Sequence, residues 1–155
     1  MEEVERLLAE QACRRVILEY ARRVDSGRAS AVAELFTLDG VWEGADGRVM
    51  RGRDEIRDAF LRREKLVRRT SRHVCTNVLV DVETEHRAVA VSYLINYRHD
   101  ARDGVPPEPA PAQLPKFMGE YHDRLVRTRD DGWLIAHRRF DLVFLRQRRD
   151  VPSPD

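Results

Sequence analysis

Ser71-Arg72-His73-Val74-Cys75-Thr76-Asn77 is the stretch of sequence on which the interpretation of the fold rests. It opens a valine-rich run, which is typical of a β-strand. Side chains alternate between the two faces of a strand, so His73, Cys75 and Asn77 are expected to share one face. A histidine and an amide on the same face of an otherwise apolar strand indicate polar groups that point into an apolar space.

The expected partner of His73 is Asp25, which comes much earlier in the chain. Apolar residues recur at helical spacing over residues 3–26, and Gly27 supplies a helix stop. Asp25 therefore lies in the last turn of an amphipathic helix, where the helix dipole disfavours a carboxylate. A residue that works against stability in this place indicates a function. We predict that Asp25 and His73 meet in a pocket and carry out acid–base chemistry.

The order of the predicted elements indicates an α+β fold. Helices are predicted at residues 3–26, 30–36 and 54–68, and long antiparallel strands at residues 71–83, 87–100, 116–129 and 133–147. A shorter strand begins at Val41 and continues into a hairpin at residues 45–48. Because the strands exceed the usual length, we expect bulges and strong curvature. The expected result is a cone-shaped, barrel-like fold in which three N-terminal helices pack on a mostly antiparallel sheet that encloses a pocket.

Length and composition predict one domain over residues 1–147, with a disordered polar tail at residues 148–155. The 28 Lys and Arg residues nearly balance 27 Asp and Glu residues, which argues against a nucleic-acid partner. No apolar run is long enough to span a bilayer, and the N-terminus lacks the apolar segment of a secretory signal. We expect a cytoplasmic protein without a membrane partner. Cys13 and Cys75 are expected to be free thiols, with a disulfide as the alternative.

A proline-stiffened loop is predicted between the two strand pairs, at residues 101–115. A loop of this length and stiffness suits a lid over the pocket or a subunit contact. A plain mobile connector explains it equally well.

Several phrases, in their order and spacing, resemble the nuclear transport factor 2-like superfamily. The resemblance is greatest to its SnoaL-like polyketide cyclase and scytalone dehydratase-like branch, and it covers about residues 5–146. The phrases are Tyr20-x-x-x-x-Asp25 with Ser26-Gly27, Leu35-Phe36-x-x-Asp39-Gly40-Val41-Trp42, Gly52 before the last helix, Ser71-Arg72-His73-x-x-x-Asn77, Gly119-x-Tyr121-x-Asp123, and Gly132-Trp133-x-Ile135-x-x-Arg138.

The resemblance implies roles for some of these residues. In dehydratase-like members, an aspartate that ends the first helix orients a histidine on the strand after the third helix, and Asp25 and His73 match these positions. Tyrosines polarise the substrate carbonyl, and Tyr20 is the first match, with Tyr97 and Tyr121 as further candidates. A second pocket histidine of some members has no matching position here, and the candidate near the corresponding strand is His99. Cyclases of this fold use a single late acid, for which Asp123 and Asp141 are the candidates.

The remaining candidates have two interpretations each. Asn77 is either a donor to an oxyanion or a strand-end amide that satisfies the backbone, and Trp42 is either core or ligand wall. His99-Asp100 and His122-Asp123 invite a metal interpretation, but no recognised ligand spacing supports one. Nucleotide-binding motifs are also missing. We therefore expect neither a metal nor a cofactor.

The resulting hypothesis is an enzyme, a cofactor-independent dehydratase or other lyase, isomerase or cyclase. Its substrate would be a small hydrophobic carbonyl compound, polyketide-like or steroid-like. His73 would move a proton beside the carbonyl, Asp25 would hold the tautomer of His73, and Tyr20 would stabilise the enolate. The alternative is a non-catalytic ligand-binding module, or the small structural subunit of a ring-hydroxylating oxygenase. The apolar surplus on residues 87–100 and 116–129 further predicts a homo-oligomer, most simply a dimer.

Overall fold

A six-stranded sheet forms the largest part of the computed structural model, which describes residues 1–147. The strand order is β2-β1-β6-β5-β4-β3. The tail predicted at residues 148–155 lies outside the described residues. The strands are β1 (Phe36–Glu43), β2 (Val49–Arg51), β3 (Arg69–Thr84), β4 (Arg87–Asp100), β5 (Phe117–Thr128) and β6 (Gly132–Leu145).

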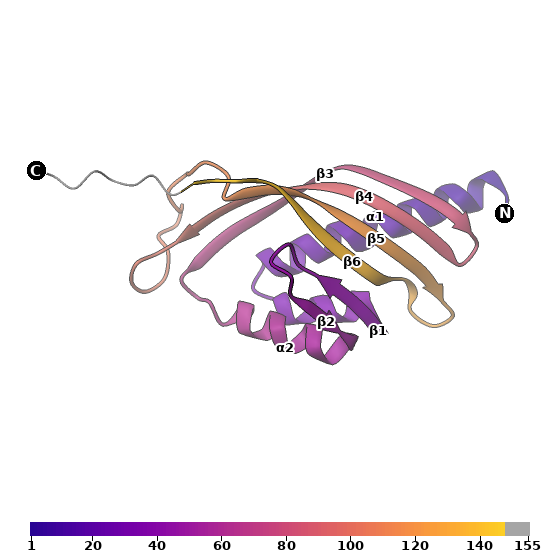
Figure 1. Ribbon diagram of the computed structural model, residues 1–155, viewed down its shortest axis with the longest axis horizontal. Helices are drawn as coiled ribbons and strands as arrows, with labels where there is room; N and C mark the ends of the chain where they lie inside the picture. Colours follow the sequence, from indigo (N-terminus) through magenta and orange to yellow (C-terminus); the bar gives the residue numbers. More distant parts are fainter. Residues whose placement is uncertain (148–155) are drawn as a thin grey trace, which may run out of the picture.

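All neighbouring strands are antiparallel except β1 and β6, which run parallel. The predicted α+β class is confirmed, and so are the bulges, because the register shifts twice between β3 and β4 and twice between β5 and β6. The sheet stays open, however, since β2 and β3 form its two edges and do not pair with each other. The long strands arch over the helices instead of closing into a barrel (Figure 1).

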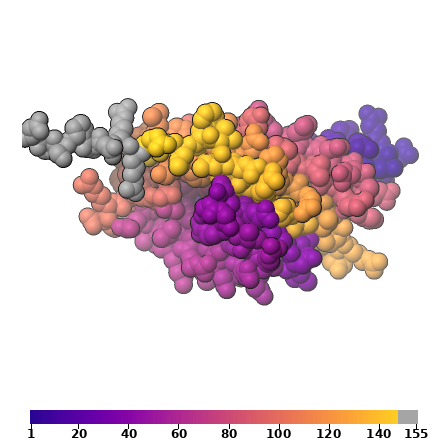
Figure 2. All heavy atoms as spheres, viewed as in Figure 1, coloured from indigo at the N-terminus to yellow at the C-terminus, as the bar shows by residue number. Residues whose placement is uncertain are grey.

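The helices lie on the concave side of the arch, with α1 (Glu3–Asp25) under the long strands and α2 (Gly52–Glu64) beside β1 and β2 (Figure 1). In the space-filling view β1 and β2 fill the space between α2 and β6 (Figure 2). The second predicted helix is a 3₁₀ helix, η1 (Ala29–Leu35), and it ends before Phe36. Phe36 begins β1 instead, because it is fully buried and pairs with Ile135 of β6. No helix within residues 1–147 has both the length and the apolar character needed to cross a membrane.

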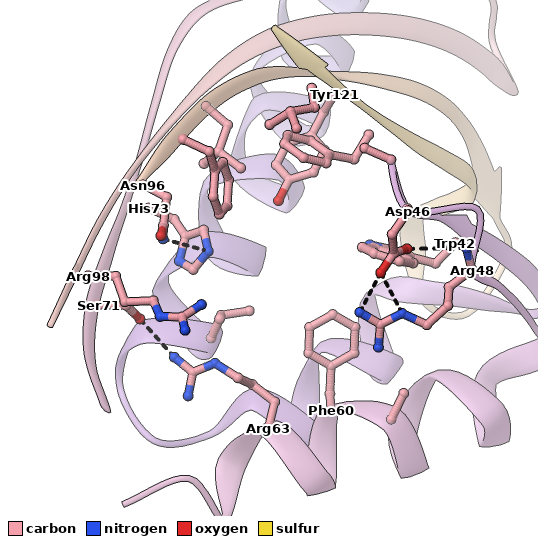
Figure 3. A pocket seen from close by; sticks show the side chains of 18 of the residues that line it. Trp42, Asp46, Arg48, Phe60, Arg63, Ser71, His73, Asn96, Arg98 and Tyr121 are labelled. Carbon is pink, nitrogen blue, oxygen red and sulfur yellow. Dashed lines mark hydrogen bonds and ion pairs between the residues drawn. The ribbon is translucent and has the colours of Figure 1, made fainter. Parts of the chain in front are cut away.

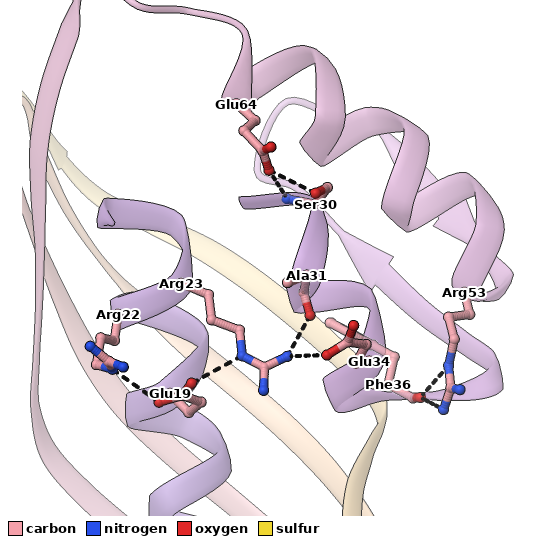
Figure 4. A network of polar contacts seen from close by, with 9 residues as sticks. All are labelled: Glu19, Arg22, Arg23, Ser30, Ala31, Glu34, Phe36, Arg53 and Glu64. Atoms are coloured by element: carbon pink, nitrogen blue, oxygen red, sulfur yellow. Dashed lines mark hydrogen bonds and ion pairs between the residues drawn. The ribbon is translucent and has the colours of Figure 1, made fainter. Parts of the chain in front are cut away.

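Polar contacts between the helical segments fix the helical layer (Figure 4). Arg23 of α1 contacts Glu19 on its own helix and donates to the Ala31 carbonyl (2.6 Å) and to Glu34 (2.8 Å) of η1. Glu64 at the end of α2 accepts hydrogen bonds from the backbone and hydroxyl of Ser30. These contacts join α1, η1 and α2 into one unit that covers the sheet.

A buried ion pair lies in the inner face of the sheet. Arg138 of β6 donates two hydrogen bonds of 2.7 Å to the Asp123 carboxylate of β5, and both side chains are almost completely inaccessible to solvent. The guanidinium carbon also lies over the ring of Tyr20 (4.2 Å to the centroid) and over that of Tyr121 (4.1 Å). Burial alone would lower the pKa of Arg138, but the adjacent Asp123 carboxylate outweighs it and raises the pKa. Arg138 is therefore a permanent cation in the core.

We expect Arg138→Met to lower the free energy of unfolding by about 3–5 kcal/mol, because it leaves the Asp123 carboxylate buried without a partner. The matched control is Arg139→Met. Arg139 is the next residue along the chain and also pairs with an aspartate, Asp141, but both members of that pair are about half exposed. Its loss should therefore cost only about 0–1 kcal/mol. Urea denaturation of the two variants makes the comparison, and equal losses would contradict the structural role of the buried pair.

Candidate active site

A cavity of about 730 Å³ lies between the helices, the β1–β2 hairpin and the inner face of the sheet. This size suits a small organic ligand. The apolar part of its wall is rich in aromatic residues: Tyr20, Trp42, Phe60, Phe117, Tyr121 and Phe140. Polar side chains are concentrated on the wall formed by β3 and β4, where Ser71, His73 and Asn96 line the cavity (Figure 3).

His73 on this wall is in direct contact with Asp25, which does not itself line the cavity. Nδ1 of His73 lies 2.7 Å from Oδ1 of Asp25, and the side chains are only 14% and 11% exposed. The other oxygen of the carboxylate, Oδ2, accepts the backbone N–H of His73 (2.5 Å), and Oδ1 also accepts the hydroxyl of Ser71 (3.0 Å). Because an ionised carboxylate only accepts hydrogen bonds, the geometry assigns the proton of a neutral imidazole to Nδ1. Nε2 then carries the lone pair, which can accept a hydrogen bond or a proton.

Asn96 contacts the other nitrogen of the ring. It lies opposite His73 in the β3–β4 register, and its Nδ2 is 3.2 Å from Nε2 of His73. Asn96 is buried, and its Oδ1 has no hydrogen-bond partner among the described residues. The amide Nδ2–H of Asn96 can donate to Nε2 of the neutral imidazole. After rotation of the amide, Oδ1 can accept a hydrogen bond from Nε2–H of the imidazolium.

Tyr20 and Trp42 form the opposite part of the wall. The indole Nε1–H of Trp42 donates to the hydroxyl oxygen of Tyr20 (3.0 Å). Burial raises the pKa of Tyr20 to about 12, and it raises the pKa of Tyr121 well above the ordinary value. Both phenols are therefore neutral near pH 7. Because the Trp42 bond uses only an acceptor position of the Tyr20 oxygen, the hydroxyl proton remains available to a ligand.

The SnoaL-like domain matches residues 5–139 of the chain. The chain belongs to the SnoaL-like family. Its fold is similar to that of a protein provisionally named a scytalone dehydratase from Novosphingobium aromaticivorans (TM-score 0.77, 19% identity, 92% of this chain and 89% of that one). It is also similar to ActVI-ORFA from Streptomyces coelicolor (TM-score 0.67, 19% identity, 88% and 96%).

A third similar structure is that of a variant of Rv3472, a protein of unknown function from Mycobacterium tuberculosis (TM-score 0.69, 27% identity, 90% of this chain and 72% of that one). Among proteins with curated descriptions, none matches this SnoaL-like chain at a significant level.

The expectation that Asn77 shares a face with His73 is wrong for this SnoaL-like domain. Two residues of β3, Asn77 and Val78, lie between the pairs Thr76–Tyr93 and Leu79–Val91, whereas β4 has only Ser92 between its partners. Asn77 occupies this bulge with φ of 51°, in the left-handed region that asparagine tolerates better than most residues. Its side chain is exposed and accepts the Thr76 hydroxyl (3.1 Å). The amide in the cavity is that of Asn96.

The expectation that Tyr97 and His99 line the cavity is also wrong. They alternate along β4 with Asn96 and Arg98, which do line it, so they lie on the outer face of the sheet. Tyr97 is 44% exposed, and Nδ1 of His99 lies 3.3 Å from the Gln113 side chain. The inner face of β4 carries the smaller residues Ala88, Ala90 and Ser92. The sequence analysis missed Asn96, and this alternation of small and large side chains is the signal that could have identified it.

The late acids do not line the cavity. Asp123 is committed to Arg138 in the core, and Asp141 contacts Arg139 and His122. No group of three or more potential metal-ligating side chains occurs within residues 1–147. Cys13 and Cys75 are both free thiols.

The proline-rich segment, residues 101–115, does not contribute a side chain to the cavity wall in this structure. Arg68 donates to the Arg102 carbonyl (2.9 Å) and Arg146 to the Leu114 carbonyl (2.9 Å), which hold the segment against its neighbours. The geometry therefore does not support the expectation of a lid.

We expect NMR of the imidazole nitrogens to show His73 as the Nδ1–H tautomer at alkaline pH, because Asp25 only accepts hydrogen bonds. Asn96→Leu should leave this tautomer in place, since the contact of Asn96 is to Nε2. In Asp25→Asn the preference should be lost. An Nε2–H tautomer in the unmodified protein would contradict the assigned geometry.

Proposed function

We propose that the protein is a cofactor-independent enzyme that moves a proton beside the carbonyl group of a small hydrophobic compound. The observation that carries the proposal is the 2.7 Å contact between Asp25 and His73 at the wall of an aromatic-lined cavity. A base held by a carboxylate is the recurring unit of acid–base catalysis. The reaction is a dehydration, an isomerisation or a cyclisation, all of which begin from such an enolate.

In the proposed mechanism Nε2 of His73 removes a proton from the carbon next to the carbonyl. The electron pair of the broken C–H bond moves onto the carbonyl oxygen, and the resulting imidazolium is stabilised by Asp25. The neutral hydroxyl of Tyr20 donates to the developing enolate oxygen. The imidazolium then returns the proton to a leaving hydroxyl in a dehydration or to another carbon in an isomerisation. In a cyclisation the enolate carbon attacks a second carbonyl, and the proton ends on the new alkoxide.

The comparisons support this class of chemistry in general terms. The SnoaL-like family match covers most of the chain, and one structural neighbour carries the name of a dehydratase. That neighbour is less than 25% identical and bears on the fold alone, so the proposed chemistry rests on the residues of the cavity.

The proposal predicts catalysed exchange of the α-hydrogens of 2-tetralone, a small aromatic ketone, in D₂O, followed by ¹H NMR. The exchange rate should fall about a hundredfold to ten-thousandfold in His73→Ala, because the base is gone. Asn77→Gly is the control, since Asn77 lies in the exposed bulge and should not affect the rate. Equal exchange with and without the protein would contradict the proposal and favour a non-catalytic ligand-binding module or subunit.

Asp25→Asn should reduce both exchange and stability. The helix dipole disfavours a carboxylate at this position, but Asp25 accepts three hydrogen bonds that join α1 to β3. An asparagine turns one acceptor into a donor that faces other donors, so we expect a loss of about 1–3 kcal/mol in the free energy of unfolding. Thermal denaturation beside the exchange assay separates the two effects, because residual folded protein is measured directly. An unchanged exchange rate in folded Asp25→Asn would remove the dyad from the mechanism.

We further propose a homodimer through the outer face of the sheet. Tyr97 on β4 and Phe144 on β6 are 44% and 65% exposed, and Val143 is 51% exposed. Large apolar side chains at the surface are typical of interfaces. Light scattering should therefore return about twice the chain mass of 18.1 kDa, and a mass of one chain at micromolar concentration would contradict the dimer.

A further inference from the structure

Arginines are concentrated at one end of the cavity. Arg63 of α2 and Arg98 of β4 line it beside Ser71 and His73 (Figure 3). Arg69 of β3 also lines the cavity and pairs with the same aspartate as Arg98, whereas Arg62 is a more exposed residue of the cavity wall. Among the described residues the only acidic side chain in the cavity wall is Asp46, which is paired with Arg48 on the opposite side of the cavity. The end of the cavity beside His73 is therefore electropositive.

Arg63 is partly buried there with few partners. One N–H of its guanidinium donates to the Ser71 hydroxyl (2.8 Å), and the described part of the chain offers no further hydrogen bond to it. A guanidinium carries five N–H donors, so most of its capacity is unused. Burial first, and then repulsion from Arg69, lower the pKa of Arg63. A bound anion would therefore stabilise the charged guanidinium of Arg63 and use its free N–H donors.

Arg69 and Arg98 share a single carboxylate. Nε of each lies 2.6 Å from an oxygen of Asp100, which is itself 42% exposed. One aspartate cannot neutralise two guanidinium groups. Asp25, although it is hydrogen-bonded to His73 and Ser71, keeps its negative charge and attracts Arg63. Arg63 is the third cation, so three arginines face two carboxylates at this end of the cavity. Without a ligand this end of the cavity therefore has an excess of cations.

A simple structural explanation covers only part of this cluster. Arg62 and Arg63 lie in the last turn of α2, where the helix dipole favours cations. That effect does not explain why Arg98 converges on the same place from β4, on the face that also carries Asn96. Residues from a helix and from two strands have been brought together around one polar end of an apolar cavity, which is how ligand-orienting groups are usually arranged.

Building on the proton-transfer function proposed above, we propose that the substrate carries a carboxylate, which Arg63 and Arg98 bind at the end of the cavity beside His73. The apolar ring system of the substrate then lies against Trp42, Phe60 and Phe117. Guanidinium and carboxylate match each other in planar, two-point hydrogen bonds. Such an anchor fixes the distance between the acid group and the reacting carbon, so that the carbonyl lies between His73 and Tyr20.

The anchor is also connected to the dyad. Arg63 donates to the hydroxyl of Ser71, and this hydroxyl donates to Oδ1 of Asp25, which contacts His73. A carboxylate bound to Arg63 therefore acts at the end of a continuous chain of hydrogen bonds that orients the base. The same chain explains why Ser71 is buried at the start of β3 although its side chain is polar.

The test is the binding of 1-naphthaleneacetate and of its neutral amide, 1-naphthaleneacetamide, by isothermal titration calorimetry. The acid should bind at least about tenfold more tightly than the amide. Raising the NaCl concentration should weaken the binding of the acid but not that of the amide. Arg63→Gln and Arg98→Met should each weaken binding of the acid by roughly tenfold to a hundredfold and leave the amide unchanged. Arg63→Gln keeps a side-chain N–H for Ser71 while removing the charge, so it also tests the charge apart from the hydrogen bond.

Arg124→Met is the matched control, because Arg124 is exposed on the outer face of β5 and does not line the cavity. It should retain the preference for the acid. His73→Ala should retain it as well, so a failure of the proton-transfer proposal is distinguishable from a failure of this one. Equal binding of acid and amide by the unmodified protein, no binding of the acid, or an equal loss in Arg124→Met would overturn the carboxylate site.

Discussion

The buried Arg138–Asp123 pair is the interaction on which the floor of the cavity depends. It ties β5 to β6, and its guanidinium lies against the rings of both Tyr20 and Tyr121, which also pack against each other. Tyr20 in turn packs edge-on against Phe36 and Phe60. One cation therefore positions side chains from α1, α2, β1 and the sheet. Burying an ion pair costs desolvation free energy. Replacing only one of its two members is more destabilising, because it leaves a single buried charge without a partner.

Asp25 has a similar double role at the other wall. Its carboxylate is the contact between the C-terminal end of α1 and the start of β3, and it is also the group that fixes the ring of His73. The helix end is unfavourable for a negative charge, yet three hydrogen bonds compensate for this. The carboxylate oxygens of Asp25 thus both stabilise the contact between α1 and β3 and orient the proposed base. This arrangement keeps the ring in one orientation before any substrate enters, which is the physical content of preorganisation.

Much of the architecture follows from local pattern. Helical spacing in residues 3–26 predicts α1 to within a residue of its observed end at Asp25, and the long alternating runs predict the four long strands. The contact between Asp25 and His73 was also predictable, because a helix-end acid and a strand-start histidine matched two positions of a known family pattern. The arginine end of the cavity was not predicted, since Arg63 and Arg98 look like ordinary members of a sequence with many surface arginines.

By itself, the sequence determined the α+β class, the family and the dyad, because periodicity, turn residues and the spacing of motifs are properties of the chain alone. Only the tertiary structure decided which amide enters the cavity and which strand face is the inner one. One extra residue in the bulge at Asn77 takes that side chain off the face of His73, and the pairing of His73 with Asn96 brings the buried amide to the ring. The alternation of side chains along a strand assigns residues to two faces, but it does not show which of the two faces the helices cover. That choice depends on packing between segments far apart in the chain, and it places Tyr97 and His99 outside while Asn96 and Arg98 point into the cavity.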